Sequence, residues 1–347
     1  MIKSLKIGNI TIGEKYPPVI IVELGINHNG NLDIAIDTAE KAINSGAEII
    51  KHQTHVVDDE MSEEAKKVIP GNSNKNIYEI IKKCSLNESD ERKLMSHIIS
   101  KKKIFISTPF SKASADRLGK FNIPAFKIGS GECNNHYFVE YICKFKKPII
   151  MSTGMNSIKS IYKSVKVIRK HKLPYVLLHC TNIYPTPNKL VRLGCIEELK
   201  KNYPDAIVGL SDHTDSIYSC LGAVAIGARV LEKHFTDNKK KRKGPDISSS
   251  MDSNELKQLI HGSNLIFKSL GGKKRHLKEE TKTSAFAFQS VVATKKIWKA
   301  DKLSLDNISL RRPGNGDYTV KDFLKILGKK VKKNIKKNTQ IKKTHFI

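Results

Sequence analysis

Short apolar runs rich in β-branched residues alternate with longer amphipathic segments through most of this chain. Each run ends in polar residues, and the segment after the first run has helical apolar spacing at Ile34, Ala35, Thr38, Ala39, Ala42 and Ile43. The eight runs are Val19–Glu23, Glu48–Gln53, Lys103–Thr108, Ala125–Ser130, Pro148–Thr153, Tyr175–Cys180, Ala206–Ser211 and Arg229–His234. Eight strand–helix units predict a (β/α)8 barrel, a fold that takes about 250 residues.

A doubly wound open sheet is the alternative arrangement of alternating strands and helices. Such a sheet usually carries a glycine-rich phosphate loop, G-x-G-x-x-G, after its first strand. The segment in that position here is GINHNG, at residues 25–30, which lacks this spacing. The sequence therefore favours the closed barrel.

The pattern changes outside the eight units. Residues 1–15 alternate apolar and polar positions, which predicts a small hairpin that covers one end of the barrel. The long connection Val56–Asn87 is a candidate for a loop that covers substrate. Ser253–Ser269 predicts a closing helix, so the barrel domain spans residues 1–270. Residues 271–284 are charged and turn-rich and predict a linker, and short alternating strands with one short helix near 322–327 predict a small α+β domain over 285–347.

The formal net charge of +28 over 347 residues suggests a nucleic-acid-binding protein as one function class. The charge, however, comes from 53 lysines and only 9 arginines, and the lysines are spread along the whole chain. Arginine is the residue that recognises phosphates and bases bidentately. The charge is therefore interpreted as solvated surface charge that attracts anionic substrates, and no nucleic-acid partner is expected.

Cysteine usage and hydropathy predict a cytoplasmic protein with no membrane partner. The six cysteines are scattered without a C-x-x-C pair, which suits a reducing compartment. No apolar run approaches the ~20 residues that a membrane helix needs. The first 18 residues contain no apolar signal region.

Polar residues follow every predicted strand, at the end where barrel enzymes place their active sites. Lys51 and Lys127 lie inside or just after apolar runs, and hydroxyl side chains and glycine-rich turns accompany them. This combination is typical of a phosphate and carboxylate site. His213 and His234 end neighbouring strands and so are candidates to share one divalent metal. The alternative is a helix cap for one histidine and a core hydrogen bond for the other.

Ordered motifs along nearly the whole chain resemble those of the bacterial sialic acid synthases. They are GINHNG (25–30), IKHQTH (50–55), MSEEAKKVIPGN (61–72), STPFS (107–111), FKIGSGECNN (126–135), STGMNS (152–157), TNIYPTP (181–187), VGLSDHT (208–214), LEKHFTD (231–237), GPDISSSMD (244–252), FAFQSVV (286–292) and RRPGNGD (311–317). The resemblance implies a TIM barrel followed by a domain similar to type III antifreeze proteins.

The resemblance also implies an activity: metal-dependent condensation of phosphoenolpyruvate with N-acetylmannosamine and water to give N-acetylneuraminate and phosphate. The expected cofactor is Mn²⁺ or Mg²⁺, held by His213 and His234, and Glu23 and Glu132 resemble the catalytic carboxylates. The residues that resemble the phosphoenolpyruvate site are Lys51, Thr108, Lys127, Ser130, Ser152 and Asn182. Those that resemble the sugar site are Gln53, Asn72, Tyr184, Asp246 and Arg312. Arg312 resembles an arginine that reaches the partner's site in a domain-swapped homodimer.

Two alternatives remain within enzyme chemistry. Relatives that make legionaminic or pseudaminic acid use 2,4-diacetamido sugars, and the run TNIYPTP resembles the N-acetylneuraminate branch more closely. A Schiff-base aldolase would instead use Lys127 or Lys233 as its nucleophile.

Overall fold

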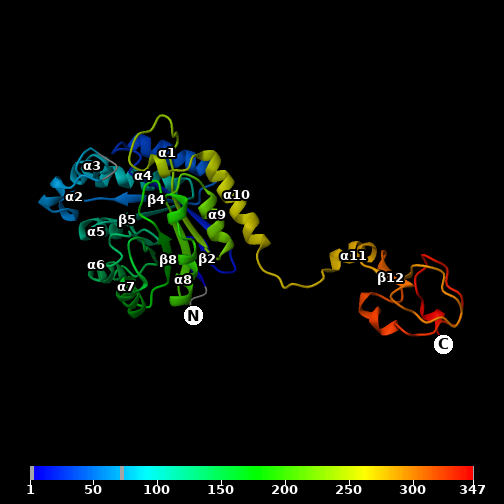
Figure 1. Ribbon diagram of the computed structural model, residues 1–347. Coiled ribbons are helices and arrows are strands. Elements are labelled where there is room, and N and C mark those ends of the chain that lie inside the picture. The colour runs from blue at the N-terminus through cyan, green and yellow to red at the C-terminus, as the bar shows by residue number, and fades with distance from the viewer. Residues whose placement is uncertain (1–3, 71–73, 347) are drawn as a thin grey trace. The chain divides into compact units, whose positions relative to one another are not determined.

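The structure is a computed structural model that describes residues 4–70 and 74–346. The chain divides into two compact units, one ending at Leu270 and one beginning at Gly271. Figure 1 shows the first unit as strands enclosed by helices.

Eight parallel strands close the first unit into a barrel, as the sequence predicts. They pair in chain order, and the last strand pairs with the first, with His234 opposite Glu23. The strands are β3 (Val19–Gly25), β4 (Ile49–Thr54), β5 (Ile104–Pro109), β6 (Phe126–Ile128), β7 (Ile149–Ser152), β8 (Tyr175–Cys180), β9 (Ile207–Asp212) and β10 (Val230–His234). β6 is shorter than its predicted run because the chain turns at Gly129.

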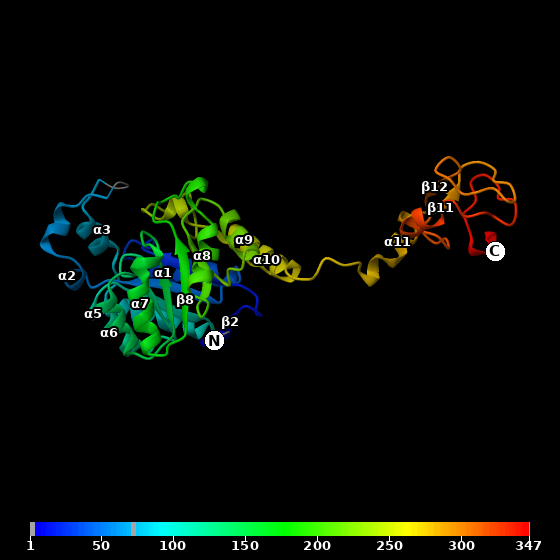
Figure 2. The ribbon, with the colours of Figure 1, turned by 60° about the horizontal axis from the view of Figure 1, so that its bottom comes forward.

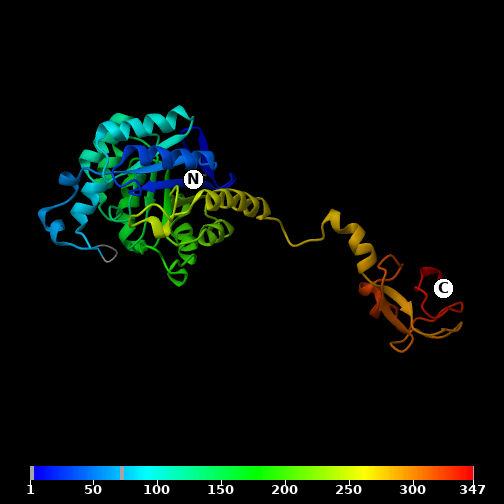
Figure 3. The same ribbon diagram turned by 90° about the horizontal axis from the view of Figure 1, so that it is seen from above.

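Helices surround the barrel and pack their apolar stripes onto the outer face of the strands. They are α1 (Leu32–Asn44), α4 (Glu88–Ser100), α5 (Lys112–Phe121), α6 (His136–Cys143), α7 (Ile158–Lys170), α8 (Gly194–Asn202), α9 (Tyr218–Ala225) and α10 (Ser253–Ser269). Side-chain caps explain where six of them begin, at Asn31, Asn87, Ser111, Asn135, Ser157 and Asp252. Figure 3 shows α1 in blue beside α4 in cyan, and the two helices pack together.

The barrel interior is closed at its N-terminal end by the predicted hairpin, formed by β1 (Ser4–Ile7) and β2 (Ile10–Gly13). Leu5, Ile7 and Ile12 of the hairpin join a buried cluster with inward-facing residues such as Ile21 and Ile106. This apolar plug leaves only the opposite end of the barrel open for polar chemistry.

The long connection after β4 carries α2 (Val57–Glu60) and α3 (Ile77–Cys84). Figures 1 and 2 show this segment projecting from the body of the first unit. Asn72, predicted to bind the sugar, belongs to this connection and lies outside the described residues.

The second unit contains one antiparallel pair, β11 (Ser290–Ala293) with β12 (Ile308–Arg311), around a small core that includes Val291, Ile297 and Ile308. The predicted short helix is a pair of 3-10 turns, Val320–Asp322 and Leu324–Ile326. The predicted linker is partly helical, because α11 (Thr281–Ala287) begins inside it and runs past residue 284. Over the described parts of both units, no helix combines the length and apolarity that crossing a membrane requires.

Candidate active site

The C-terminal ends of the barrel strands surround a cavity of about 180 Å³. Twelve of the fifteen predicted site residues line it, and they come from the ends of all eight strands or the loops that follow them. These residues are Glu23, Lys51, Gln53, Thr108, Lys127, Ser130, Glu132, Ser152, Asn182, Tyr184, His213 and His234.

The two cavity lysines are fully enclosed and are held by hydroxyl groups of neighbouring strands. Lys51 Nζ donates to Thr108 Oγ1 at 3.0 Å and forms an ion pair with Glu23. Lys127 Nζ donates to Ser152 Oγ at 2.8 Å. Burial lowers the pKa of Lys51 to about 7, because the charged ammonium loses its water. An anion bound beside Lys51 would raise this pKa again and so restore the positive charge of the ammonium group.

The glycine-rich turns bring backbone N–H groups close to the same side of the cavity. Gly154 N donates to Ser130 Oγ at 3.0 Å. A Cβ atom on Gly154 would collide with the side chains of Asn182 and Ser130, so only glycine fits there. Ser130 and Asn182 therefore pack against the backbone after β7, and both side chains line the cavity.

His213 and His234 lie side by side, with ring centroids 5.5 Å apart. His213 Nδ1 donates to the carbonyl of Thr181 at 2.9 Å, which leaves its Nε2 available as a ligand. His234 Nδ1 is buried and has no hydrogen-bond partner within the described residues. Burial holds the pKa of His234 well below its usual range, so this imidazole is neutral. Burial lowers the pKa of His213, but its contacts with Cys180 and the carbonyl of Thr181 raise this pKa overall. A divalent metal binds deprotonated imidazole, so a metal held by this pair would displace the proton of His213.

Asp246 does not line the cavity, but it lies directly behind His234. Its Oδ2 is 3.6 Å from His234 Nδ1, and burial raises its pKa to about 6. Gly25 allows this approach, because it has a positive φ of 55° and a Cβ there would lie 3.0 Å from the His234 ring. Asp246 thus borders the predicted sugar subsite without facing its centre.

Glu132 is a half-buried residue at the cavity edge, and its Oε2 atom is buried. Burial raises its pKa to about 7, and its Oε2 makes no hydrogen bond to the described residues. A carboxyl with this pKa can both donate and accept a proton near neutral pH.

The sequence analysis missed Glu232 as a site residue. Its Oε1 lies 3.3 Å from Lys127 Nζ and 3.8 Å from Lys51 Nζ, and it accepts a hydrogen bond from Ser211 at 3.1 Å. The available signal was the strand period of two, since Glu232 precedes His234 by two residues and so shares its inward face. Ser211, Cys180 and Phe110 also line the cavity and had no predicted role.

The two lysines of the aldolase alternative have different surroundings. Lys127 lines the cavity, whereas Lys233 lies outside it, bonded to Asp212 Oδ2 at 2.5 Å and to the carbonyl of Thr214 at 2.8 Å. A buried ammonium in an ion pair is a poor nucleophile.

Arg312 belongs to the second unit, where its Nε donates to the carbonyl of Ala287 at 3.0 Å.

The NeuB family model matches residues 38–275 and the SAF domain model matches residues 288–347. An uncharacterized protein of Methanocaldococcus jannaschii is 38% identical over 95% of both chains. The N,N'-diacetyllegionaminic acid synthase of Campylobacter jejuni is 36% identical, covering 93% of this chain and 98% of that protein. The pseudaminic acid synthase of the same species is 32% identical, covering 99% and 100%.

Among solved structures, the N-acetylneuraminic acid synthetase of Leptospira borgpetersenii aligns with a TM-score of 0.74 at 29% identity. The alignment covers 82% of this chain and 95% of that one. The matched ranges include both the barrel with its cavity and the small second unit. The chain therefore belongs to the NeuB family of synthases for sialic-type acids and ends in a SAF domain.

Proposed function

We propose that the protein condenses phosphoenolpyruvate with N-acetylmannosamine and water to give N-acetylneuraminate and phosphate. One observation carries the proposal: a single cavity brings together two enclosed lysines, a cluster of hydroxyl and amide groups, a histidine pair and acidic side chains. Each group matches a need of that reaction, and the relatives named above make acids of the same chemical type.

The lysine side of the cavity is suited to phosphoenolpyruvate. Lys51 and Lys127 supply positive charge, and Thr108, Ser152 and Ser130 supply hydroxyl donors. Charge-assisted hydrogen bonds to phosphate and carboxylate oxygens are strong in an enclosed site. The same donors stabilise the negative charge on phosphate as it leaves the tetrahedral intermediate.

The histidine side is suited to a divalent metal, Mn²⁺ or Mg²⁺. His213 and His234 are the residues that would hold it, because both line the cavity and their ring centroids lie 5.5 Å apart. The described residues contain no group of three or more His, Cys, Asp or Glu side chains placed to hold a metal ion. Water and substrate oxygens would complete the shell, and the bound metal would polarise the sugar aldehyde.

The carboxylates are suited to the proton transfers. Glu23 lies two residues before the end of β3, opposite His234, and one of its carboxylate oxygens accepts a hydrogen bond from the backbone N–H of Gly25. We assign Glu23 to positioning and deprotonating the water that adds at carbon 2 of the phosphoenolpyruvate part. Glu132, with a pKa of about 7, supplies or takes up the second proton.

A 2,4-diacetamido sugar is the second candidate acceptor. The 36% identity to a diacetyllegionaminic acid synthase favours it, whereas the TNIYPTP run favours N-acetylmannosamine. Both sugars fit the same mechanism, because their structures differ only at positions distant from the aldehyde that reacts.

Phosphate release tests the proposal. Purified protein with Mn²⁺ and phosphoenolpyruvate is given N-acetylmannosamine or 2,4-diacetamido-2,4,6-trideoxymannose, and kcat/KM is compared. We expect release to depend on the sugar and to be faster with N-acetylmannosamine. Faster release with the diacetamido sugar would reassign the acceptor, and no release with either would refute the reaction.

A further inference from the structure

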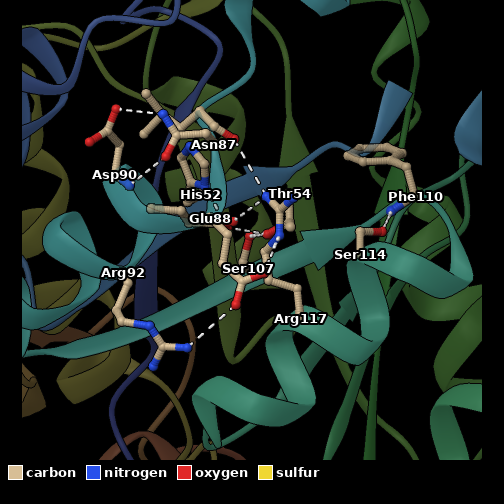
Figure 4. Close-up of polar contacts among 12 residues, drawn as sticks. His52, Thr54, Asn87, Glu88, Asp90, Arg92, Ser107, Phe110, Ser114 and Arg117 are labelled. Atoms are coloured by element: carbon tan, nitrogen blue, oxygen red, sulfur yellow. Dashed lines mark hydrogen bonds and ion pairs between the residues drawn. The ribbon is translucent and has the colours of Figure 1, made fainter. Parts of the chain in front are cut away.

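A buried polar network lies behind the cavity, on the outer face of β4 and β5 where barrels normally pack apolar side chains. Figure 4 shows His52, Thr54, Ser107 and Arg117 pointing toward one another between these strands and the helices that cover them. Together with His28 and Glu91, these side chains join the loop after β3, both strands, α4 and α5. None of the six lines the cavity.

The donor and acceptor nitrogens of His28 and His52 can be assigned in one way only. Gly30 N donates to His28 Nδ1 at 3.1 Å, so the proton of neutral His28 is on Nε2. His28 Nε2 lies 3.2 Å from His52 Nε2, which must therefore accept. The remaining proton of His52 is on Nδ1, 3.1 Å from Glu91 Oε1. We call Gly30, His28, His52 and Glu91 the histidine chain.

The carboxylate of Glu91 is the common acceptor that orients the network. It also accepts from Thr54 Oγ1 and from Arg117 at 3.1 Å, and Ser107 Oγ lies 2.7 Å from Thr54 Oγ1. Burial alone would raise the pKa of Glu91, but the hydrogen bonds from His52, Thr54 and Arg117 lower it below its usual value. Glu91 is thus an ionised carboxylate that is stabilised by hydrogen bonds from His52, Thr54 and Arg117.

The histidine chain anchors one side of the 25–30 loop, and the other side is bonded to the segment that carries Asp246. Asn27 Nδ2 donates to the carbonyl of Phe235 and to Ser250 Oγ, both at 2.9 Å. A backbone hydrogen bond from Ile26 reaches Asp246 itself. On β4, His52 directly precedes Gln53, which lines the cavity. The loop therefore connects the two residues, Gln53 and Asp246, that border the predicted sugar subsite.

We infer that His28, His52 and Glu91 are positioning residues for the acceptor sugar, holding Gln53 and Asp246 at their working separation. This inference rests on the proposed function. It assigns the network to the sugar subsite, because the 25–30 loop that the histidines anchor is bonded to the segment that carries Asp246. Of the six residues assigned to phosphoenolpyruvate, only Lys51 lies on β4, and the other five lie on β5 to β8 or the loops that follow them.

His28→Phe is the direct kinetic test. Phenylalanine keeps a planar aromatic ring, of slightly larger volume, to stack on His52, whose centroid lies 5.2 Å away, but removes both hydrogen bonds. We expect the KM for the sugar to rise at least about tenfold, as for other supporting residues of binding sites. The KM for phosphoenolpyruvate should change less than about twofold. His28→Gln, whose amide can donate toward His52, should recover most of the loss.

Tyr175→Phe is the matched control. It also removes one buried hydrogen bond, from Tyr175 to Asp205 at 2.8 Å, but at the first residue of β8, the opposite end of the barrel. It should leave both KM values unchanged. An unchanged sugar KM in His28→Phe, or an equal rise in both KM values, would overturn the inference.

Imidazole NMR on the unmodified protein tests the histidine chain without any turnover. In ¹⁵N-histidine-labelled protein at pH 7, His28 should be the Nε2–H tautomer and His52 the Nδ1–H tautomer. Any other protonation of either ring refutes the chain. If the wild type releases no phosphate with either sugar, the proposed function fails by itself and these tautomers decide the histidine chain.

Discussion

His213 and His234 are held by different contacts, and that difference shapes their expected behaviour. His213 is fixed through Nδ1 by the carbonyl of Thr181, whereas the buried Nδ1 of His234 has Asp246 as its nearest carboxylate. We predict that His213→Ala and His234→Ala each reduce turnover by at least about a thousandfold, because a metal-polarised aldehyde is lost. The same variants should retain less Mn²⁺ after dialysis, measured by elemental analysis.

A chelator gives the complementary result. EDTA should abolish wild-type turnover, and added Mn²⁺ should restore it. His171→Ala is the control, since His171 pairs with Glu140 on the helical layer and does not line the cavity. Full activity of either cavity variant in excess EDTA would remove the metal from the mechanism.

Lys51 makes phosphoenolpyruvate binding dependent on pH. Its pKa of about 7 means that the free protein loses this charge as pH rises through 7, and a bound anion raises the pKa again. Binding above pH 7 therefore takes up a proton, and affinity should fall by up to about tenfold per pH unit between pH 7 and 9. Calorimetry in buffers of different ionisation enthalpy measures the uptake.

Lys51→Arg provides the comparison, because a guanidinium stays charged over this range. Its affinity for phosphoenolpyruvate should vary much less with pH than that of the wild type. An identical pH slope in both proteins would assign the proton to another group.

At the scale of elements, the ends of β9 and β10 are tied together by a buried ion pair. Lys233 and Asp212 directly precede His234 and His213, and their side chains are almost fully enclosed. We predict that Lys233→Met lowers the free energy of unfolding by about 3–5 kcal/mol, because Asp212 is left buried without a cation. Urea denaturation measures the loss.

Two further variants separate this effect from a general one. The double variant Asp212→Asn/Lys233→Met should lose less stability than Lys233→Met alone, since no isolated charge remains. Lys66→Met breaks an exposed ion pair with Glu63 and should leave the free energy of unfolding nearly unchanged. Equal losses in the free energy of unfolding for Lys233→Met and Lys66→Met would show that the buried ion pair stabilises the protein no more than the exposed one.

For the whole molecule, we predict that the protein works as a dimer in which Arg312 completes the partner's site. The second unit presents Arg311 and Arg312 beside a glycine-rich turn, although lysine is the cation used almost everywhere else. A guanidinium suits multiple hydrogen bonds to a sugar amide oxygen. Inactive His213→Ala and Arg312→Ala chains, mixed and allowed to exchange, should recover about a quarter of wild-type activity, from one intact site in each mixed dimer.

The control for this experiment is a mixture of two chains that both carry His213→Ala, which should stay inactive. Subunit exchange is verified with differently tagged chains. An inactive mixture after verified exchange would place Arg312 in its own chain's site or outside any site.

The sequence by itself determined the barrel, because eight apolar runs with intervening helical spacing have few other ways to bury their surfaces. It also located the open end, since polar residues follow every strand and the predicted hairpin, whose strands lie within residues 4–13, closes the other end. The helix α11 escaped prediction because it has no buried face and so no apolar stripe to reveal it.

Only the tertiary structure decided which charged groups meet. Lys51, Lys127 and Glu232 come from three different strands, and their separation depends on barrel closure, which strand period alone does not specify. The histidine chain shows the same limit: His28, His52 and Glu91 lie on a loop, a strand and a helix. Local patterns report which face a residue occupies, whereas contacts between distant segments depend on how the elements pack.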